Sequence, residues 1–299
     1  MSLLLLPLPH ESARAARLAP GLGADVAAVA FHRFPDGESY VRLDADATGR
    51  DVVVLSTMVR PDEKLAPLLF AAAAARERGA RRVLLAAPYL AYMRQDASFR
   101  PGEAVTARVV AKALSGAFDA VVTIDPHLHR VASLGELYAV PTIAVSAAPS
   151  IAEFVGRTVS SPLLVGPDAE SGRWVGAVAE RLGAPCVVFE KTRQGDREVS
   201  IGGSAGIGLW RGRTPVLVDD IISTGRTMIG AASLLQREGF AKALVIGVHA
   251  VLGPRARDEL AAAHVERVVT CDTIEDPTNA IPLDAVLVEG VLAAVARSA

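Results

Sequence analysis

The chain has 299 residues, which is enough for two α/β domains of ordinary size. Hydrophobic residues make up 51% of it and charged residues 21%, a composition that excludes a disordered chain and predicts sizeable buried cores. With 31 Lys and Arg against 33 Asp and Glu, it has no excess of positive charge for binding nucleic acid, so any phosphate binding must be local.

The first predicted element is the apolar run at residues 1–9. It is short, is broken by Pro7 and Pro9, and has neither the basic segment nor the cleavage site of a signal peptide, so we interpret it as a buried strand. No window approaches the roughly 18 uninterrupted apolar residues of a membrane span. We therefore expect no membrane contact.

Beyond this run, short β-branched segments alternate with Ala- and Leu-rich amphipathic segments, the pattern of parallel strands joined by helical crossovers. The predicted fold class is α/β, with mainly parallel sheets flanked by helices. Strands are predicted at residues 52–55, 83–86, 120–124, 142–145, 163–165, 186–189, 216–218, 244–248 and 267–270. Helices are predicted at residues 63–78, 103–115, 150–155, 171–182, 227–238, 254–263 and 285–296.

This alternation runs once to about residue 145 and once more after it, so we predict domains at residues 1–145 and 146–299. The pattern leaves open that the closing helix packs back on the first domain. Ligands are expected at the carboxyl ends of the strands, near the cleft between the halves. The two cysteines, Cys186 and Cys271, lack metal-ligand spacing and predict buried free thiols in a reducing cytoplasm.

The strongest local signal is residues 215–228, a hydrophobic strand that ends in Asp219 and Asp220 and runs through a Ser/Thr/Gly turn into a helix. Such a turn points backbone N–H groups and hydroxyls at one spot, where the helix dipole also favours an anion. Because like charges repel, the two acids are expected to hold sugar hydroxyls or a magnesium ion instead of the phosphate. The simpler interpretation, helix capping, leaves the second acid unexplained. The segment therefore predicts a site for a phosphorylated sugar.

Three segments of the first half have polar groups suited to a nucleotide. Residues 34–38 read Phe-Pro-Asp-Gly-Glu, which alone is a plain Pro-Asp-Gly turn. Residues 88–103 include arginines that could clamp phosphate oxygens and a glutamine that could bind a base. His127 follows a predicted strand, where an imidazole could bind metal or contact phosphate, although a lone histidine there is more often structural.

In their order and spacing these segments resemble the ribose-phosphate diphosphokinase (phosphoribosyl pyrophosphate synthetase) family. Residues 215–228 resemble the phosphoribosyl-diphosphate loop that this family shares with type I phosphoribosyltransferases. Gly-Pro-Asp at residues 166–168 is similar to a metal-associated turn of the family. Glu-Lys-Thr-Arg at residues 190–193 is similar to its mobile loop over ATP, and residues 194–197 provide a polar, glycine-containing continuation.

The resemblance implies two phosphoribosyltransferase-type domains, an ATP-site domain followed by a ribose 5-phosphate domain. It implies transfer of the terminal diphosphate of Mg·ATP to the 1-hydroxyl of ribose 5-phosphate, in service of nucleotide biosynthesis. Lys191 and Arg193 are expected to neutralise transition-state charge, and His127 and Asp168 to hold Mg²⁺. The expected ATP contacts are Phe34, Asp36, Gly37, Glu38, Arg94, Gln95, Asp96, Arg100 and His127. The expected ribose 5-phosphate contacts are Arg193, Asp219, Asp220, Ser223, Thr224, Gly225, Arg226 and Thr227.

The sequence departs from the family pattern at Arg226, where glycine is usual, at Ser223, where aspartate is common, and at residues 169–171, which replace a small, glycine-rich run. Two alternatives stay open. A type I phosphoribosyltransferase would need residues 219–227 but neither the ATP segments nor Lys191, and a catalytically silent regulatory homologue would bind nucleotides or partner subunits. The resemblance also implies a homo-oligomer, a dimer at minimum, in which residues 34–38 reach a neighbour's ATP site.

Overall fold

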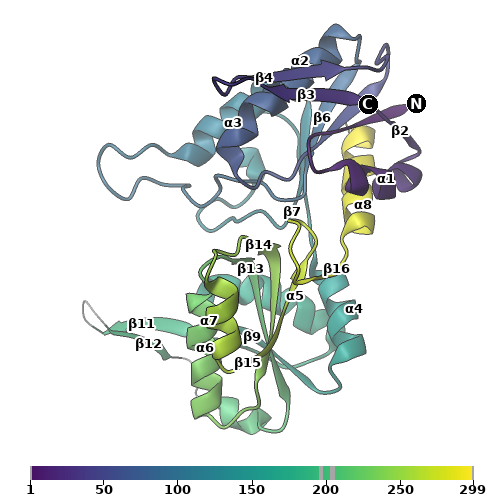
Figure 1. Ribbon diagram of the computed structural model, residues 1–299. Coiled ribbons are helices and arrows are strands. Elements are labelled where there is room, and N and C mark those ends of the chain that lie inside the picture. The colour runs from purple at the N-terminus through teal and green to yellow at the C-terminus, as the bar shows by residue number, and fades with distance from the viewer. Residues whose placement is uncertain (1, 195–197, 203–205, 298–299) are drawn as a thin grey trace. The chain divides into compact units, whose positions relative to one another are not determined.

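The computed structural model describes residues 2–194, 198–202 and 206–297, with only the backbone described for the strand residues between 190 and 202 (Figure 1). Contacts divide the chain into two compact units. Unit 1 comprises Met1–Ser146 together with Asp284–Ala299, and unit 2 comprises Ala147–Leu283. Each unit is built around one six-stranded sheet.

Unit 1 has a fully parallel sheet with the strand order β2-β1-β5-β6-β7-β8. Its strands are β1 (Leu3–Pro7), β2 (Ala24–Val26), β5 (Asp51–Leu55), β6 (Arg82–Ala87), β7 (Ala120–Ile124) and β8 (Thr142–Val145). β1, β5 and β7 are buried along their whole length, as expected for strands covered by helices on both faces. An antiparallel hairpin of β3 (Val29–Arg33) and β4 (Ser39–Leu43) lies outside this sheet.

The helices of unit 1 are α1 (Ser12–Leu22), α2 (Leu65–Glu77), α3 (Thr106–Ala117) and α8 (Asp284–Arg297). The closing helix α8 packs on α1, β7 and β8. The packing is close, since a Cβ atom on Gly290 would lie 2.8 Å from Cγ1 of Val145. Arg17 holds the first residue of α8 through an ion pair of 2.5 Å to Asp284. This anchoring explains why residues 284–299 belong to unit 1 even though they are last in the chain.

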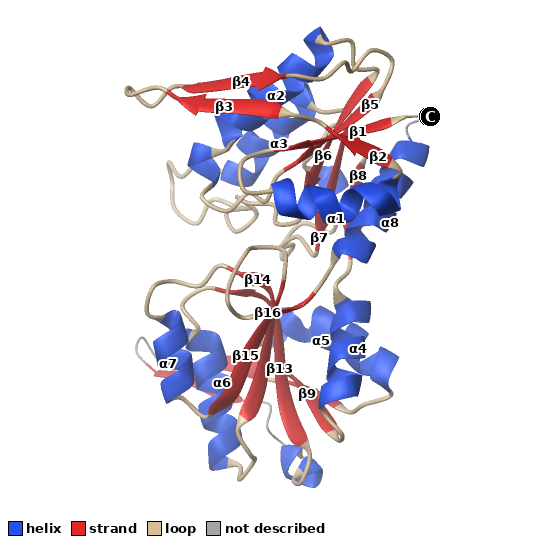
Figure 2. Cartoon of the chain, turned by 45° about the vertical axis from the view of Figure 1, so that its right-hand side comes forward, coloured by secondary structure: helices blue, strands red, loops and turns tan. Residues whose placement is uncertain are grey.

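Unit 2 has a second fully parallel sheet with the order β10-β9-β13-β14-β15-β16. Its strands are β9 (Pro162–Gly166), β10 (Cys186–Val188), β13 (Thr214–Ile222), β14 (Ala243–Ala250), β15 (Val265–Cys271) and β16 (Asn279–Ile281). Helices α4 (Ala148–Thr158) and α5 (Gly172–Leu182) cover one face, and α6 (Arg226–Arg237) and α7 (Ala256–Ala262) cover the other (Figure 2). A second hairpin pairs β11 (Glu190–Gln194) with β12 (Glu198–Gly202).

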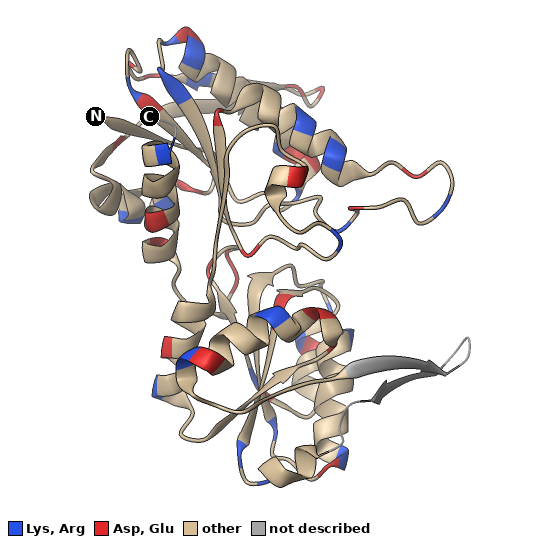
Figure 3. Ribbon diagram, turned by 180° about the vertical axis from the view of Figure 1, so that it is seen from behind, with Lys and Arg blue, Asp and Glu red and all other residues tan. Residues whose placement is uncertain are grey.

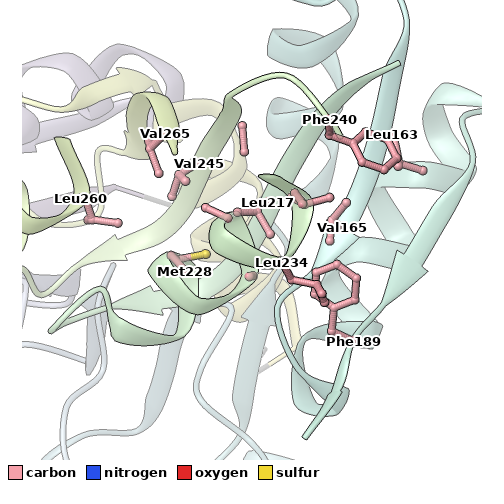
Figure 4. Close-up of a cluster of buried hydrophobic side chains, with 14 of the residues drawn as sticks. Leu163, Val165, Phe189, Leu217, Met228, Leu234, Phe240, Val245, Leu260 and Val265 are labelled. Carbon is pink, nitrogen blue, oxygen red and sulfur yellow. The ribbon is translucent and has the colours of Figure 1, made fainter. Parts of the chain in front are cut away.

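The core of unit 2 joins the sheet to α6 and α7. Leucine and valine side chains of β9, β13 and β14 meet Met228 and Leu235 of α6 and Leu260 of α7, with Phe189 and Phe240 filling one end (Figure 4). Because this core holds β13 and α6 together, the turn between them has a defined position.

Charged residues lie mainly on helices and connecting segments (Figure 3). Among the described residues the buried charged side chains are Glu11, Arg14, Asp51, Asp96 and Asp220. Burial alone would raise the pKa of Asp51, but hydrogen bonds from Arg82 and Arg81 outweigh it and lower that pKa to about 2. Each of the other buried charges likewise needs local compensation.

The predicted α/β class with parallel sheets flanked by helices is confirmed, and all the predicted strands and helices are present. The sequence interpretation missed α1, the edge strands β2 and β16, and the two hairpins, and each of the missed strands is only three to five residues long. Both cysteines are free as predicted, but the prediction that both are buried is wrong: Cys186 is exposed because it begins the edge strand β10. None of the helices within the described ranges is long and apolar enough to span a bilayer.

Candidate active site

The turn after β13 leads directly into helix α6 and places the backbone N–H groups of the helix start beside it. β13 ends at Ile222 and α6 begins at Arg226, so Ser223, Thr224 and Gly225 form the turn. Gly225 has a φ of +75°, and a Cβ atom there would lie 2.9 Å from Cγ of Leu260, so a larger residue would strain the backbone and displace its neighbour. The N-cap residue Gly225 has no side chain to cap this end, and the N–H of Arg226 makes one long hydrogen bond of 3.4 Å to the hydroxyl oxygen of the exposed Thr224. The helix start therefore presents backbone donors at the turn, where an anion could replace that contact.

The same turn is held in place from α7 and the loop before it. Gly253 donates its N–H to the carbonyl oxygen of Ser223 at 3.0 Å, and the buried Leu260 of α7 packs against Gly225. Thr224 is exposed and Thr227 half-buried. The turn thus has a fixed backbone and accessible hydroxyls, as a phosphate site requires.

The side chain of Arg226 is exposed and lines a groove of about 880 Å³ between α6 and α7. Ser233 and Gln236 line the same groove, because they follow Arg226 at helical spacing on one face of α6. The backbone of Arg226 belongs to the turn, and a contact of its guanidinium with a sugar phosphate stays a prediction.

Three carboxylates gather at the carboxyl edge of the sheet in unit 2. Asp219 and Asp220 lie in β13 shortly before it ends at Ile222, and Asp168 follows β9, the neighbouring parallel strand. Asp219 is half-buried and Asp220 is 3% exposed. Asp168 begins a 3-10 turn (Ala169–Ser171), where its carboxylate accepts the N–H of Ser171 at 3.3 Å. The parallel pairing of β9 and β13 is what brings Asp168 near the other two acids.

Burial raises the pKa of Asp219 to about 8, and the negative charges of Asp220 and Asp168 add to that rise. Its carboxylate is therefore protonated near neutral pH unless positive charge is supplied. A divalent cation among these oxygens would relieve the repulsion, and carboxylate oxygens are the ligands that Mg²⁺ prefers. Asp168, Asp219 and Asp220 are thus of the ligand type that magnesium prefers.

Residues 34–38 form the tip of the β3–β4 hairpin and are exposed. Gly37 has a φ of +95°, and Gly37 donates its N–H to the carbonyl oxygen of Phe34 at 2.9 Å. Asp36 accepts the N–H of Glu38 at 3.0 Å. The local geometry is that of the Pro-Asp-Gly turn anticipated from the sequence. The ATP contacts predicted for Phe34, Asp36, Gly37 and Glu38 stay predictions.

The segment between β6 and α3 contains the predicted ATP-binding arginines and glutamine. Arg94 and Arg100 are exposed. The side-chain oxygen of Gln95 accepts the Thr106 hydroxyl at 3.4 Å, and its carbonyl oxygen accepts the N–H of Ala107 at 3.3 Å, so Gln95 is tied to the start of α3. Asp96 is 8% exposed and forms an ion pair of 2.9 Å with Arg130.

His127 is half-buried in the loop after β7. Its Nδ1 lies 3.0 Å from Nε2 of His129, and the chain enters this loop through Asp125 at a φ of +33°. His127 belongs to unit 1 and Asp168 to unit 2. Their predicted role as joint Mg²⁺ ligands stays a prediction.

Lys191 and Arg193 lie in β11, opposite Ile201 and Val199 of β12. Their side chains, and residues 195–197 at the predicted mobile continuation, lie outside the described part of the structure. Their catalytic role stays a prediction. The backbone is an antiparallel hairpin here, and the mobile loop over ATP that the resemblance implies stays a prediction.

Sequence reasoning missed Arg130, which the fold places against Asp96 across 34 residues. It also missed Gly253 and Leu260, which support the phosphate turn. An exposed arginine in a polar loop gives no local signal of its partner. The requirement that a buried carboxylate be paired applies only once Asp96 is known to be buried.

Comparison with known proteins covers almost the whole chain. Residues 3–117 match the N-terminal domain of ribose phosphate pyrophosphokinase, and residues 134–285 match the phosphoribosyl transferase domain. The ribose-phosphate pyrophosphokinase of Methanopyrus kandleri is 36% identical over 277 residues, covering 92% of this chain and 94% of that protein. That of Methanothermobacter thermautotrophicus is 35% identical, covering 89% and 92%. The crystal structure of phosphoribosylpyrophosphate synthetase from Mycobacterium smegmatis matches with a TM-score of 0.87 at 26% identity, covering 99% of this chain and 100% of that one. The chain therefore belongs to the ribose-phosphate pyrophosphokinase family.

Proposed function

We propose that this protein is a ribose-phosphate diphosphokinase, which transfers the β,γ-diphosphate of Mg·ATP to the 1-hydroxyl of ribose 5-phosphate and releases AMP. The observation that supports this most is the edge of unit 2 where Asp168, Asp219 and Asp220 adjoin the start of α6, whose N-cap residue is Gly225. The carboxylate oxygens of this edge can bind a cation or accept hydrogen bonds from sugar hydroxyls. The backbone N–H groups of the helix start can donate to a phosphate. A phosphorylated sugar requires both.

In this proposal residues 223–227 hold the 5-phosphate through backbone N–H groups and hydroxyls. Asp219 and Asp220 accept hydrogen bonds from the ribose hydroxyls, and Asp168 and His127 are each proposed as ligands of Mg²⁺. When bound, the magnesium ion neutralises charge on the ATP phosphates and helps to orient them. The raised pKa of Asp219 fits an acid whose charged form depends on such a cation.

The chemical step is a direct displacement. The ribose 1-oxygen attacks the β-phosphorus, the bond from that phosphorus to the oxygen bridging the α-phosphorus breaks, and AMP leaves with the bonding electrons while the hydroxyl proton goes to solvent. No covalent enzyme intermediate is needed, so the protein supplies positioning and charge stabilisation. Lys191 and Arg193 on the β11–β12 hairpin neutralise the oxygens of the transferring group.

ATP is the proposed donor because the segments with Arg94, Gln95 and His127 lie in unit 1, within or just beyond the match to the N-terminal domain of ribose phosphate pyrophosphokinase. A type I phosphoribosyltransferase has no use for such segments. We further propose a homo-oligomer, at least a dimer, acting in the cytoplasm in nucleotide biosynthesis.

The test is release of AMP from Mg·ATP by the purified full chain, measured with and without ribose 5-phosphate. We expect AMP formation that depends on both the sugar phosphate and Mg²⁺. Binding of both ligands without AMP would favour a silent homologue. Release of diphosphate from phosphoribosyl diphosphate upon addition of a nucleobase, without use of ATP, would favour a phosphoribosyltransferase.

A further inference from the structure

Arg130 connects two loops of unit 1 that are far apart in the sequence. Its Nη1 donates to Oδ1 of Asp96 at 2.9 Å, and its backbone N–H donates to Oδ2 of the same carboxylate at 3.2 Å. Its guanidinium carbon also lies 5.0 Å from the ring centroid of Phe99. The loop after β7 is thus attached to the loop after β6 at both Asp96 and Phe99.

Both carboxylate oxygens of Asp96 are engaged by Arg130, and the Asp96 side chain is only 3% exposed. A buried carboxylate is costly unless an opposite charge and hydrogen bonds compensate it. The side chain of Arg130 is 52% exposed, so its cost of burial is smaller. The pair has one firmly placed acid and one cation that reaches it from the neighbouring loop.

The neighbours of this pair are the predicted ATP contacts. Arg94 and Gln95 precede Asp96 directly, and His127 lies three residues before Arg130. Gln95 is tied to the start of α3, and Arg94 is exposed. The Asp96–Arg130 ion pair joins these two groups of side chains. A shift of either loop would change the spacing between them.

We propose that Asp96 and Arg130 are positioning residues, which hold the Arg94–Gln95 segment and the His127 loop at the spacing that ATP requires. Asp96 then acts through Arg130 and does not contact ATP, which differs from the contact expected for it from the sequence. Because Arg130 neutralises Asp96, the carboxylate of Asp96 would not repel the triphosphate of ATP. The proposal rests on the proposed function, because it assigns these loops to ATP.

The test compares Asp96→Asn, Arg130→Gln and the double variant in steady-state kinetics. Because each single change breaks the same link, we expect each to raise the KM for ATP about tenfold, the effect of losing about one charge-assisted hydrogen bond. We expect the double variant to be no worse than the singles, and the KM for ribose 5-phosphate to stay unchanged. Arg130→Lys keeps the charge and should recover part of the loss. Arg76→Gln, which breaks the exposed Arg76–Asp119 pair of 3.1 Å in the same unit, is the matched control.

Amide hydrogen exchange of the ligand-free protein provides a readout that needs no activity. Both single variants should speed exchange in residues 94–100 and 127–134 together, whereas Arg76→Gln should not. Unchanged exchange in either loop would overturn the inference. A loss of ATP affinity in Asp96→Asn but not in Arg130→Gln would also overturn the inference, because Asp96 would then act on ATP directly. A wild-type protein that binds no ATP would instead overturn the proposed function, with the exchange result unaffected.

Discussion

Replacing Gly225 with alanine tests whether the phosphate turn is defined by backbone geometry and by α7 together. Gly225 has a φ of +75°, which costs a residue with a side chain roughly 1–2 kcal/mol. The new Cβ would also lie 2.9 Å from Cγ and 3.1 Å from Cδ1 of Leu260, which is fully buried and cannot swing into solvent. Overpacking of this kind costs about 1–3 kcal/mol. We therefore expect Gly225→Ala to lower the free energy of unfolding of unit 2 by roughly 2–5 kcal/mol.

Two other glycines of unit 2 separate these contributions. Gly183 has a φ of +59° with no atom within 4 Å of an added Cβ, so Gly183→Ala should show the backbone cost alone. Gly176 lies inside α5 with neither a positive φ nor a close neighbour, so Gly176→Ala should be neutral or stabilise by about 0.4–1 kcal/mol. Both tryptophans of the chain, Trp174 and Trp210, are in unit 2, so tryptophan fluorescence during urea denaturation reports this unit. A loss for Gly225→Ala no larger than that for Gly183→Ala would refute the role of Leu260.

Two further predictions concern the charged groups of the site. Lys191→Ala should lower turnover by at least about 10²-fold with little change in the unfolding midpoint, because it removes charge needed in the transition state. Near-normal turnover would show that Lys191 takes no part in the mechanism. The control is Lys242→Ala, which removes an exposed lysine of the same unit. Folding raises the pKa of Asp219 to about 8, so protonation of Asp219 favours the folded state. In magnesium-free buffer, this contribution to the free energy of unfolding should be lost as the pH rises from about 4 through about 8. Asn does not titrate, so Asp219→Asn should remove this loss. The urea-denaturation midpoints of the wild-type protein and of Asp219→Asn should therefore converge or cross over that pH range. Parallel pH profiles would contradict the assignment.

The sequence determined much of the secondary structure and of the site in unit 2. Continuous β-branched runs such as β5 and β14 can be buried on both faces, which indicates parallel strands covered by helices. The turn after Asp220 could likewise be interpreted locally, because strand, acids, turn and helix are consecutive in residues 215–228. Recognition of the family came from the order and spacing of short segments, and the comparisons confirm it.

Only the tertiary structure decided which distant residues meet. Asp168 lies near Asp219 because β9 and β13 are neighbours in the sheet, and that pairing helps to set the pKa of Asp219. Asp96 meets Arg130, and α8 returns to β7 and β8, through contacts between segments separated by many residues. A sequence specifies periodicity and turn chemistry within short windows. The energies of burial and charge pairing depend on the neighbours that the folded chain brings into contact, so these features could be known only from the fold.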